Sequence, residues 1–465
     1  MDTDLLIELL HTLDAPQWRY KQLESYYTGT QPLSYLSPEA RVALGDRFAR
    51  MVSNLPRLAV TSLAERLRIT GFAGPDVWDD WLRLDLDQLS AVAMREALLF
   101  GQSFVIVWAD TVGRPLATVE SPKQVAVITD PGTRVVTSAV KRWRTQTTTE
   151  AVVYLPDQII RLRANTPGAA TSGFETVNVV DNVLGVVPVV PVRNTDLISV
   201  YHPNANGVTD VGHSEVQDLM PLVDGLAKLL TDMMVTSEYV GRPRRWATGV
   251  ELVERPVVDS DGNAVLDEDN QPVMEAVSPF PEGDRLMTAE SELARFGQLE
   301  AASLDGYQNA VAVLMQQISA VSALPAHMLG ITTALPPSAD AIRAAEAALT
   351  ARAEQRQQTF GRAWEAVARL IVAVRDGVDP AAVRVQAQWA PADTSSVAAE
   401  ADATVKLFQV GLLPASYALA KLGYSADEIA AIRAARAADA ASPINHTNLP
   451  VNGPQNANQG QESEN

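Results

Sequence analysis

The residue types that usually carry out chemistry are few in this sequence, and their spacing matches no common catalytic or metal-binding motif. Cysteine is absent, so no thiolate site can form. The sequence also lacks the phosphate-binding P-loop, the dinucleotide-binding glycine motif, the paired histidines of zinc proteases and the serine elbow of hydrolases. No two histidines have metal-ligand spacing, and the five are His11, His202, His213, His327 and His446. We therefore expect no catalytic residue, no metal and no cofactor.

Carboxylates are abundant but carry little information about chemistry. The chain has 56 acidic and 37 basic residues, a net charge of −19. In such a chain a pair like Asp79–Asp80 is more often a solvated face than a catalytic dyad. The stretch DSDGN at 259–263 has its glycine at the fourth position, whereas a calcium loop needs it at the sixth, so turn formation explains these residues better.

The same acidic balance limits the classes of partner. Proteins that grip nucleic-acid phosphates need clustered Lys and Arg, which this chain lacks overall. An acidic wall could still surround DNA, because it would let the DNA slide without binding it. The charge therefore excludes a phosphate-gripping protein but not a conduit for DNA.

Length and composition indicate a globular protein of more than one domain. The chain has 465 residues, of which 47% are hydrophobic and 20% charged. The absence of cysteine favours a reducing compartment. The acidic N-terminus predicts no secretory signal, and no uncharged run approaches the roughly 18 residues of a membrane span, so we expect no membrane partner.

The first 200 residues predict a β-rich α+β domain. Residues 88–101 have the pattern of a helix closed by Gly101, and SFVIVWAD at 103–110 is typical of a buried strand. Further strand-like segments lie at 116–119, 125–128, 139–143, 151–155 and 159–162.

A helix is expected from residue 214 to about 240. Ser214 and Gln217 have capping-box spacing. Apolar residues then recur every three or four positions, at Val216, Leu219, Val223, Leu226, Leu230 and Met233. The pattern fits either an ordinary buried helix or a helix that packs against copies of itself in a ring.

The segment 242–298 is predicted to be a small, acidic β insert. From Glu251 to Arg295 it has 12 acidic residues and 3 arginines, and Asp261–Gly262 is a hairpin-turn signal. Three arginines precede it, and they either contact a phosphate or a partner protein or form salt bridges with the insert: Arg242, Arg244 and Arg245.

An apolar, proline-rich connector separates two further helices. The first helix is expected at 301–321, and the second begins at Ser338, a good N-cap, and continues for about 35 residues, or about 50 Å. The connector is unusual because loops are normally polar. A short strand at 383–389 and more helices follow, and the Asn/Gln/Gly/Pro-rich tail 442–465 is expected to be disordered.

Five segments, in this order, resemble the portal proteins of tailed bacteriophages, in particular the type found in siphophages of actinobacteria. The resemblance covers about residues 18–435. One departure is GHSEV at 212–216, where the family would have an arginine at His213. The segments are YYTGTQPLSYL (26–36), NLPRLAVTSLAERLRITGF (54–72), ALLFGQSFVIVWADTVGRP (97–115), LGVVPVVPVRN (184–194) and LPAHMLG (324–330) ahead of PPSADAIRAAEA.

The resemblance implies an α+β portal fold with a mixed wing, a helical stem, a small β-rich clip, a long helix beside the tunnel and a helical crown. In that scheme the regions are the wing at 1–209, a stem helix at 210–241, the clip at 242–298, a second stem helix at 299–322, a tunnel loop at 323–337, the long helix and return strand at 338–390, the crown at 391–441 and the tail at 442–465.

The resemblance also implies roles for particular residues. Subunit packing in the stem would use Leu219, Val223, Leu226 and Leu230. Arg242, Arg244 and Arg245 would contact the motor or the adaptor. The surface of the tunnel loop toward DNA would be formed by Leu324, Pro325, His327, Met328, Leu329, Ile331 and Leu335. The alternative is that this loop packs on its own wing and buries those side chains.

The implied function is that of a conduit. A ring of about twelve copies at one capsid vertex would let double-stranded DNA in, driven by the large subunit of a terminase, retain it and release it. Further partners would be a head-to-tail adaptor, the major capsid protein and possibly a scaffold protein, with assembly in the host cytoplasm and a final place in the virion. Two other hypotheses are a non-viral helical scaffold and a metal-dependent enzyme that processes nucleic acid.

Overall fold

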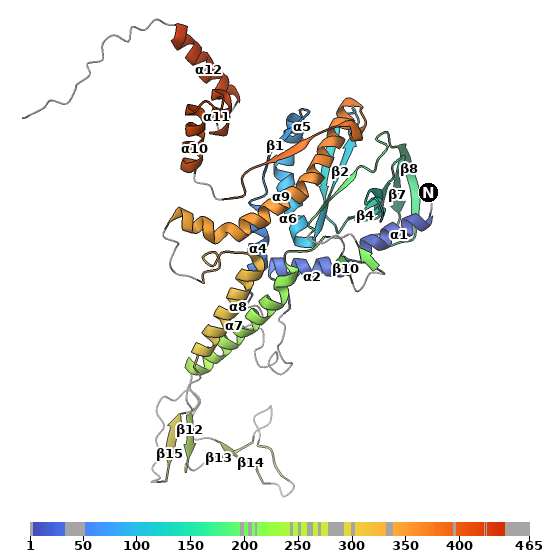
Figure 1. Ribbon diagram of the computed structural model, residues 1–465. Helices are drawn as coiled ribbons and strands as arrows, with labels where there is room; N and C mark the ends of the chain where they lie inside the picture. The colour runs from blue at the N-terminus through green and yellow to red at the C-terminus, as the bar shows by residue number, and fades with distance from the viewer. Residues whose placement is uncertain are drawn as a thin grey trace, which may run out of the picture. The chain divides into compact units, whose positions relative to one another are not determined.

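The structure is a computed structural model, shown in Figure 1. It describes residues 3–32, 52–195, 200–202, 207–209, 212–241, 245–249, 253–257, 264–267, 271–277, 293–298, 303–331, 338–393, 397–422, 424 and 426–441. The chain divides into two units, residues 1–393 and 394–465. Every strand pair among the described residues is antiparallel, and helices and sheets are mixed, which confirms the α+β class.

The described part of the first hundred residues is largely helical. Its helices are α1 (Thr3–Asp14), α2 (Gln17–Thr28), α4 (Leu55–Ala64), α5 (Trp78–Arg83) and α6 (Leu86–Phe100). The predicted helix at 88–101 is confirmed as α6. It ends at Gly101, whose φ of +91° is costly for any residue with a side chain.

Two antiparallel sheets follow α6. The central strand of the first is β2 (Gln102–Ala109), between β3 (Pro115–Glu120) and β9 (Val189–Arg193). The second is a meander of β4 (Val125–Thr129), β5 (Val136–Arg144), β6 (Thr149–Tyr154), β7 (Gln158–Ala164) and β8 (Phe174–Asp181). One face of the meander packs against leucines of α1, and the other against Phe104 and Ile106 of β2.

The predicted strands are confirmed as β2 to β7, whereas β8 and β9 were not predicted. β9 is interrupted by Pro191, which is tolerated because β9 is an edge strand. β8 is also an edge strand and is almost entirely exposed, so its residues show no buried face.

Three long helices form the second half of the first unit. α7 (Met220–Gly241) and α8 (Asp305–Ser322) lie side by side, as Figure 1 shows. α9 (Ala339–Asp376) begins at Ser338, whose Oγ accepts a hydrogen bond from the Ala341 N–H at 3.2 Å, as predicted. Its apolar stripe is buried, and Trp364 packs edge-on against Trp81, 5.3 Å between ring centres. β16 (Gln386–Trp389) then pairs with β1 (Ile69–Ala73).

The predicted capping box at Ser214 and Gln217 does not form. A short 3-10 turn (Gln217–Leu219) precedes α7, and the Ser214 Oγ instead accepts from the Val216 N–H and donates to the Leu99 carbonyl. Ser214 therefore joins the end of α6 rather than starting a helix.

The insert contains two small strand pairs among its described residues. β12 (Arg245–Thr248) pairs with β15 (Arg295–Gln298), and β13 (Val253–Pro256) with β14 (Met274–Val277). The Val265 N–H donates to the Val257 carbonyl at 2.8 Å, so the chain folds back between these residues as the hairpin prediction requires. Asp261–Gly262 itself lies outside the described residues.

The described residues also include a short strand pair and the helices of the second unit. β10 (Val200–His202) pairs with β11 (Gly207–Thr209). The second unit has helices α10 (Val397–Gln409), α11 (Ala415–Lys421) and α12 (Ala426–Ala441). The predicted disordered tail 442–465 lies outside the described residues.

Candidate functional site

The candidate site is the junction of α7, α8 and α9 around residues 323–331, the described part of the apolar connector. α8 ends at Ala323, which has a φ of +57°, and Pro325 follows two residues later. The Ser319 Oγ donates to the Leu324 carbonyl at 2.7 Å, and the Ser322 Oγ accepts from the Leu324 N–H at 3.3 Å. These bonds hold the first turn of the 323–331 segment against the helix that it leaves.

The segment packs on its own chain. Leu324 is 1% exposed, and Pro325 and Leu329 are also buried. Met328 and Ile331 are partly buried against the same core. In this conformation the side chains of Leu324, Pro325 and Leu329 contribute to the core beneath them and are not exposed as a collar surface. Leu335 lies outside the described residues.

His327 also contacts its own chain. Its Nε2 lies 3.7 Å from the Oε1 of Glu346, a buried carboxylate on α9. Arg66, just after α4, donates to the other oxygen of Glu346 at 2.7 Å and to the Ala392 carbonyl at 2.6 Å. His327 was expected on the loop surface toward DNA, but its imidazole contacts Glu346 of its own chain. Through Glu346 the 323–331 segment is connected to α9 and to Arg66 at the end of α4.

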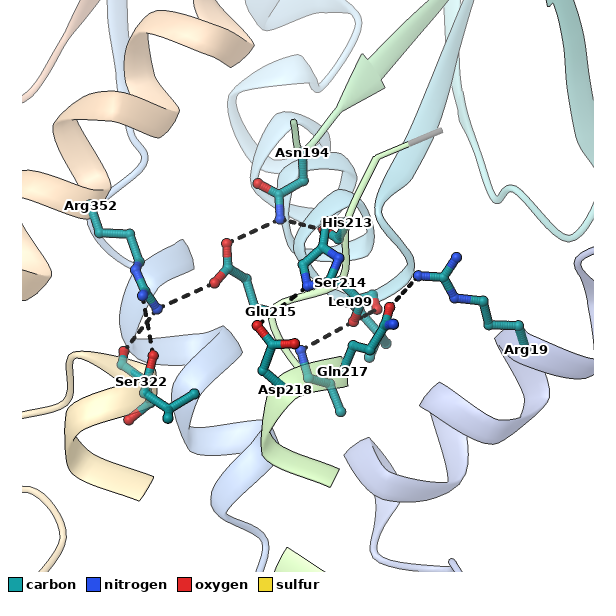
Figure 2. Close-up of polar contacts among 12 residues, drawn as sticks. Arg19, Leu99, Asn194, His213, Ser214, Glu215, Gln217, Asp218, Ser322 and Arg352 are labelled. Carbon is teal, nitrogen blue, oxygen red and sulfur yellow. Dashed lines mark hydrogen bonds and ion pairs between the residues drawn. The ribbon is translucent and has the colours of Figure 1, made fainter. Parts of the chain in front are cut away.

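A second carboxylate, that of Glu215, lies just before α7 with its side chain 10% exposed (Figure 2). Arg356 of α9 donates to its Oε1 from Nη2 at 2.8 Å and from Nε at 3.2 Å. The Asn194 Nδ2 donates to the same oxygen at 3.0 Å, and the Arg352 Nη1 to Oε2 at 3.4 Å. Arg356 is only 2% exposed, so its charge is balanced inside the protein by Glu215.

Arg352 extends this cluster to the end of α8. Its two terminal nitrogens donate to the carbonyls of Val321 and Ser322, at 3.1 and 3.2 Å. The last carbonyls of a helix have no partner within it and carry partial negative charge. Arg352 therefore caps α8 while it binds Glu215, and one side chain of α9 connects both neighbouring helices.

These contacts determine geometry more than they add stability. Desolvating two charges costs about as much as their attraction returns, but removing one partner leaves an unbalanced buried charge. The cluster therefore allows one arrangement of the three helices and penalises others.

The predicted subunit contacts on α7 lie within the single chain. Leu219, Val223 and Leu226 are buried in the same core as Ile318 of α8, and Leu230 is partly buried against it. These side chains are unavailable to another copy in this conformation, because α8 and the rest of the first unit cover them. The buried-helix interpretation of this stripe therefore describes the three residues correctly.

The remaining predicted positions are the arginines before the insert and His213. Arg242 and Arg244 lie outside the described residues, and Arg245 begins β12 opposite Gln298. His213, where the resemblance would place an arginine, has its Nε2 3.5 Å from the Asp218 Oδ2, an ion pair when the histidine is protonated.

Sequence reasoning missed the charged residues of this junction. One signal was available, since Arg356 occupies a position in the otherwise apolar stripe of α9 and such an arginine requires a buried partner. Nothing in the sequence identified Glu215 as that partner. Within the described part of the chain, no three His, Asp or Glu side chains lie together as a metal site requires, and no helix is long and apolar enough to cross a membrane.

Comparison with known families gives one match that covers most of the chain. A family model described as phage portal protein, SPP1 Gp6-like, matches residues 8–442. The portal protein of Mycobacterium phage L5 is 30% identical over 429 residues, which are 85% of this chain and 82% of that protein. The portal protein of Mycobacterium phage D29 is 28% identical over 448 residues, 90% of this chain and 86% of that one.

Solved structures with a similar fold include chains of a gene transfer agent. One is from the neck of the native particle with C12 symmetry, with a TM-score of 0.42, 14% identity and coverage of 87% of this chain and 99% of that one. Another is from the virion of the native particle, with a TM-score of 0.42 and 13% identity over 87% and 99% of the two chains.

Proposed function

The chain belongs to the SPP1 Gp6-like family of phage portal proteins, and from that premise we propose that its copies form a ring-shaped channel at one vertex of a phage head. DNA passes inward through this channel when the terminase motor packages it, is retained there, and leaves by the same route at ejection. Head-to-tail adaptor proteins attach to the ring. The chain itself needs no catalytic residue, because the motor supplies the energy.

The observation that carries the proposal is the match of the portal family model to residues 8–442, nearly the whole chain. The order of elements agrees with it: a mixed domain, a helix, an acidic β insert, a returning helix, the apolar connector and a long helix. The excess of carboxylates also suits a channel that must not bind the DNA it conducts.

We assign the regions in the same order. Residues 1–209 form the wing, 210–241 and 299–322 the stem, and 242–298 the clip that faces the motor and later the adaptor through Arg242, Arg244 and Arg245. The tunnel loop is 323–337, the long helix and its return strand are 338–390, and the crown is 391–441. The ring has twelve subunits, is assembled in the host cytoplasm, contacts the major capsid protein, and becomes part of the virion.

Burial narrows the part of the tunnel loop that can touch DNA. The first leucine, the proline and the second leucine of LPAHMLG are buried in their own subunit. Contact with DNA therefore falls to Met328 and Ile331, which are only partly buried, and to Leu335. Two contacts attach the start of the loop to α9. Glu346 of α9 contacts His327, and Arg352 of α9 binds both Glu215 and the Ser322 carbonyl at the end of α8.

The first test is the mass and shape of the purified protein, measured by mass photometry and negative-stain microscopy. We expect rings of about a dozen copies with a central hole. A stable dimer with a closed interface would contradict the proposal, because a closed dimer cannot conduct DNA through a central channel.

The second test concerns the loop. A photo-crosslinking amino acid at Leu335 should crosslink to DNA in filled heads, and the same amino acid at Val183, a nearly fully exposed position of the wing, should not. Equal crosslinking at both positions, or none at Leu335, would show that the loop does not contact the DNA. Neither result would contradict the proposed ring.

A further inference from the structure

The strand β8 is a free edge of the five-stranded meander. It lies last in the order β4-β5-β6-β7-β8, and among the described strands it pairs with β7 alone. Seven of its eight residues are exposed, and none is proline or lysine, the residues that commonly protect an edge. A register shift falls at Val177, so the regular end of the edge runs from Asn178 to Asp181. The backbone groups on the outer side of this end are free to accept another strand.

A pocket of about 400 Å³ lies beside this end of β8. Its lining comes from β6, β7 and β8 on one side and from β2 and β3 of the other sheet on the opposite side. Most of the lining is apolar, and it includes Trp108, Leu116 and Val180. Leu116 and Val180 are each 45% exposed, so the pocket is open to solvent where the two edge strands β3 and β8 meet it.

The polar groups in the pocket are hydrogen-bond donors, and none of the described residues that line it is acidic. They are the side chains of Thr118, Tyr154, Arg161 and Asn178. Arg161 reaches the Glu150 carboxylate only at 3.3 Å and is 51% exposed, whereas Arg163 donates to the same carboxylate at 2.6 Å. Arg163 therefore balances Glu150, and the charge of Arg161 remains available to a ligand.

We propose that the end of β8 and this pocket bind an extended segment of a partner protein, which adds a strand to the meander. Main-chain hydrogen bonds to β8 hold the segment, and alternate side chains of the segment enter the pocket. One of these side chains is large and apolar and lies beside Trp108. Another is a carboxylate that binds Arg161, the one charged group of the lining. Because side chains of a strand alternate between its faces, the two lie two positions apart.

Peptide selection against the full chain, kept as dilute subunits, tests the site. From a random mRNA-displayed library we expect enrichment of sequences with a large apolar residue two positions from an Asp or Glu. Val180→Glu puts a carboxylate into the pocket and should enrich none of them. Val179→Glu is the matched control, because Val179 is 49% exposed and pairs with Ile160, on the opposite face of the meander. It should enrich the same sequences as the wild type.

Fluorescence anisotropy with a synthetic copy of an enriched peptide measures each contribution. Changing its acidic residue to the corresponding amide should weaken binding at least about tenfold, because a charge-assisted hydrogen bond is lost. Methylating alternate backbone nitrogens should weaken it at least as much in one of the two possible patterns, because donors to β8 are removed. Arg161→Gln should bind the acidic and the amide peptide equally. Arg343→Gln, which removes a surface arginine paired with Asp340, should bind as the wild type does.

The outcomes distinguish the possible occupants of the groove. Binding by dilute subunits and by rings alike, with the expected losses, supports the proposal. The absence of any enrichment that depends on Val180 overturns it. Equal binding of both methylated peptides shows that the pocket takes a side chain without an added strand, which also overturns it. A peptide that binds subunits but not rings shows that a neighbouring copy covers the groove, so a separate partner protein is wrong.

Discussion

Two carboxylates organise the junction of the three long helices, Glu346, which is buried, and Glu215, which is mostly buried. Glu215 receives hydrogen bonds from Arg352, Arg356 and Asn194, and Glu346 is shared by Arg66 and His327. In both cases α9 supplies one partner, and the other comes from a helix end or a connector. Each carboxylate thus makes the position of a loop depend on the position of α9.

Glu215→Gln should strongly destabilise the chain. It removes the negative charge that pairs with Arg352 and with the buried guanidinium of Arg356, and the expected loss is about 3–5 kcal/mol of unfolding free energy. Chemical denaturation of the subunit measures it. Glu354→Gln, the same change at an exposed position of α9, should cost less than about 0.5 kcal/mol. Similar small losses for both variants would show that the cluster is not coupled to folding.

The Glu96 side chain of α6 gives a prediction for pH. Burial raises the pKa of the Glu96 carboxyl, offset in part by Ser121 and Lys123, and its Oε2 has no hydrogen-bond partner among the described atoms. The folded chain therefore holds this proton more tightly than the unfolded chain, and stability decreases as pH rises through the raised pKa.

Glu96→Gln should consequently have a higher Tm than the wild type at neutral pH, and the difference should shrink in acid, where both side chains are neutral. Thermal unfolding at several pH values measures it. Glu65→Gln, at an exposed position after α4, should show no such trend. A Glu96→Gln difference that is constant with pH would contradict the assignment.

At the scale of elements, the end of α6 is closed by a segment more than ninety residues further along. The Asn194 N–H donates to the Gly101 carbonyl at 2.8 Å, and the Glu215 N–H to the Leu98 carbonyl at 3.0 Å. Gly212 lies against Gly101 so closely that a Cβ on it would be 1.8 Å from the Gly101 oxygen. This backbone contact places Glu215 beside α9, within hydrogen-bond distance of Arg352 and Arg356.

Gly212→Ala should therefore destabilise the chain, by at least about 1–3 kcal/mol, because both contacting atoms belong to the backbone and must move. Gly306→Ala is the matched control, since a Cβ at this second residue of α8 meets open space and alanine favours a helix over glycine, by up to about 1 kcal/mol. The two Tm values should move in opposite directions. A neutral Gly212→Ala would mean that the contact is not needed.

At the scale of the whole molecule, charge opposes assembly. Each copy carries a net charge of −19, so neighbouring copies repel one another wherever acidic faces meet.

Added salt should therefore promote ring formation. The Debye length falls severalfold between about 50 mM and about 500 mM salt, which screens the repulsion but leaves apolar contacts intact. Mass photometry should show a larger fraction of rings at the higher concentration, whereas a neutral osmolyte at equal osmolality should have less effect. Rings that dissociate in salt would show instead that ion pairs between copies dominate.

The local pattern of the sequence was enough to predict much of the fold. Hydrophobic periodicity and end signals identified the helices α6, α8 and α9, each of which has an apolar face with the period of a helix. Short apolar and β-branched runs between turn signals identified the strands β2 to β7, several of which are buried on both faces. The order of motifs predicted the family, which the family model confirms. The exposed edge strand β8 had no such face and was missed.

The tertiary structure alone decided what covers each apolar face and which charges pair. The α7 stripe and the 323–331 segment were compatible with burial in their own subunit and also with a surface toward other copies or DNA, and the structure buries most of both in their own subunit. Arg356 and Glu215 are 141 residues apart, and Arg66 and Glu346 are 280 apart. Periodicity reports that a residue is buried but not against what, because the partner is chosen by packing between elements that are distant in the chain.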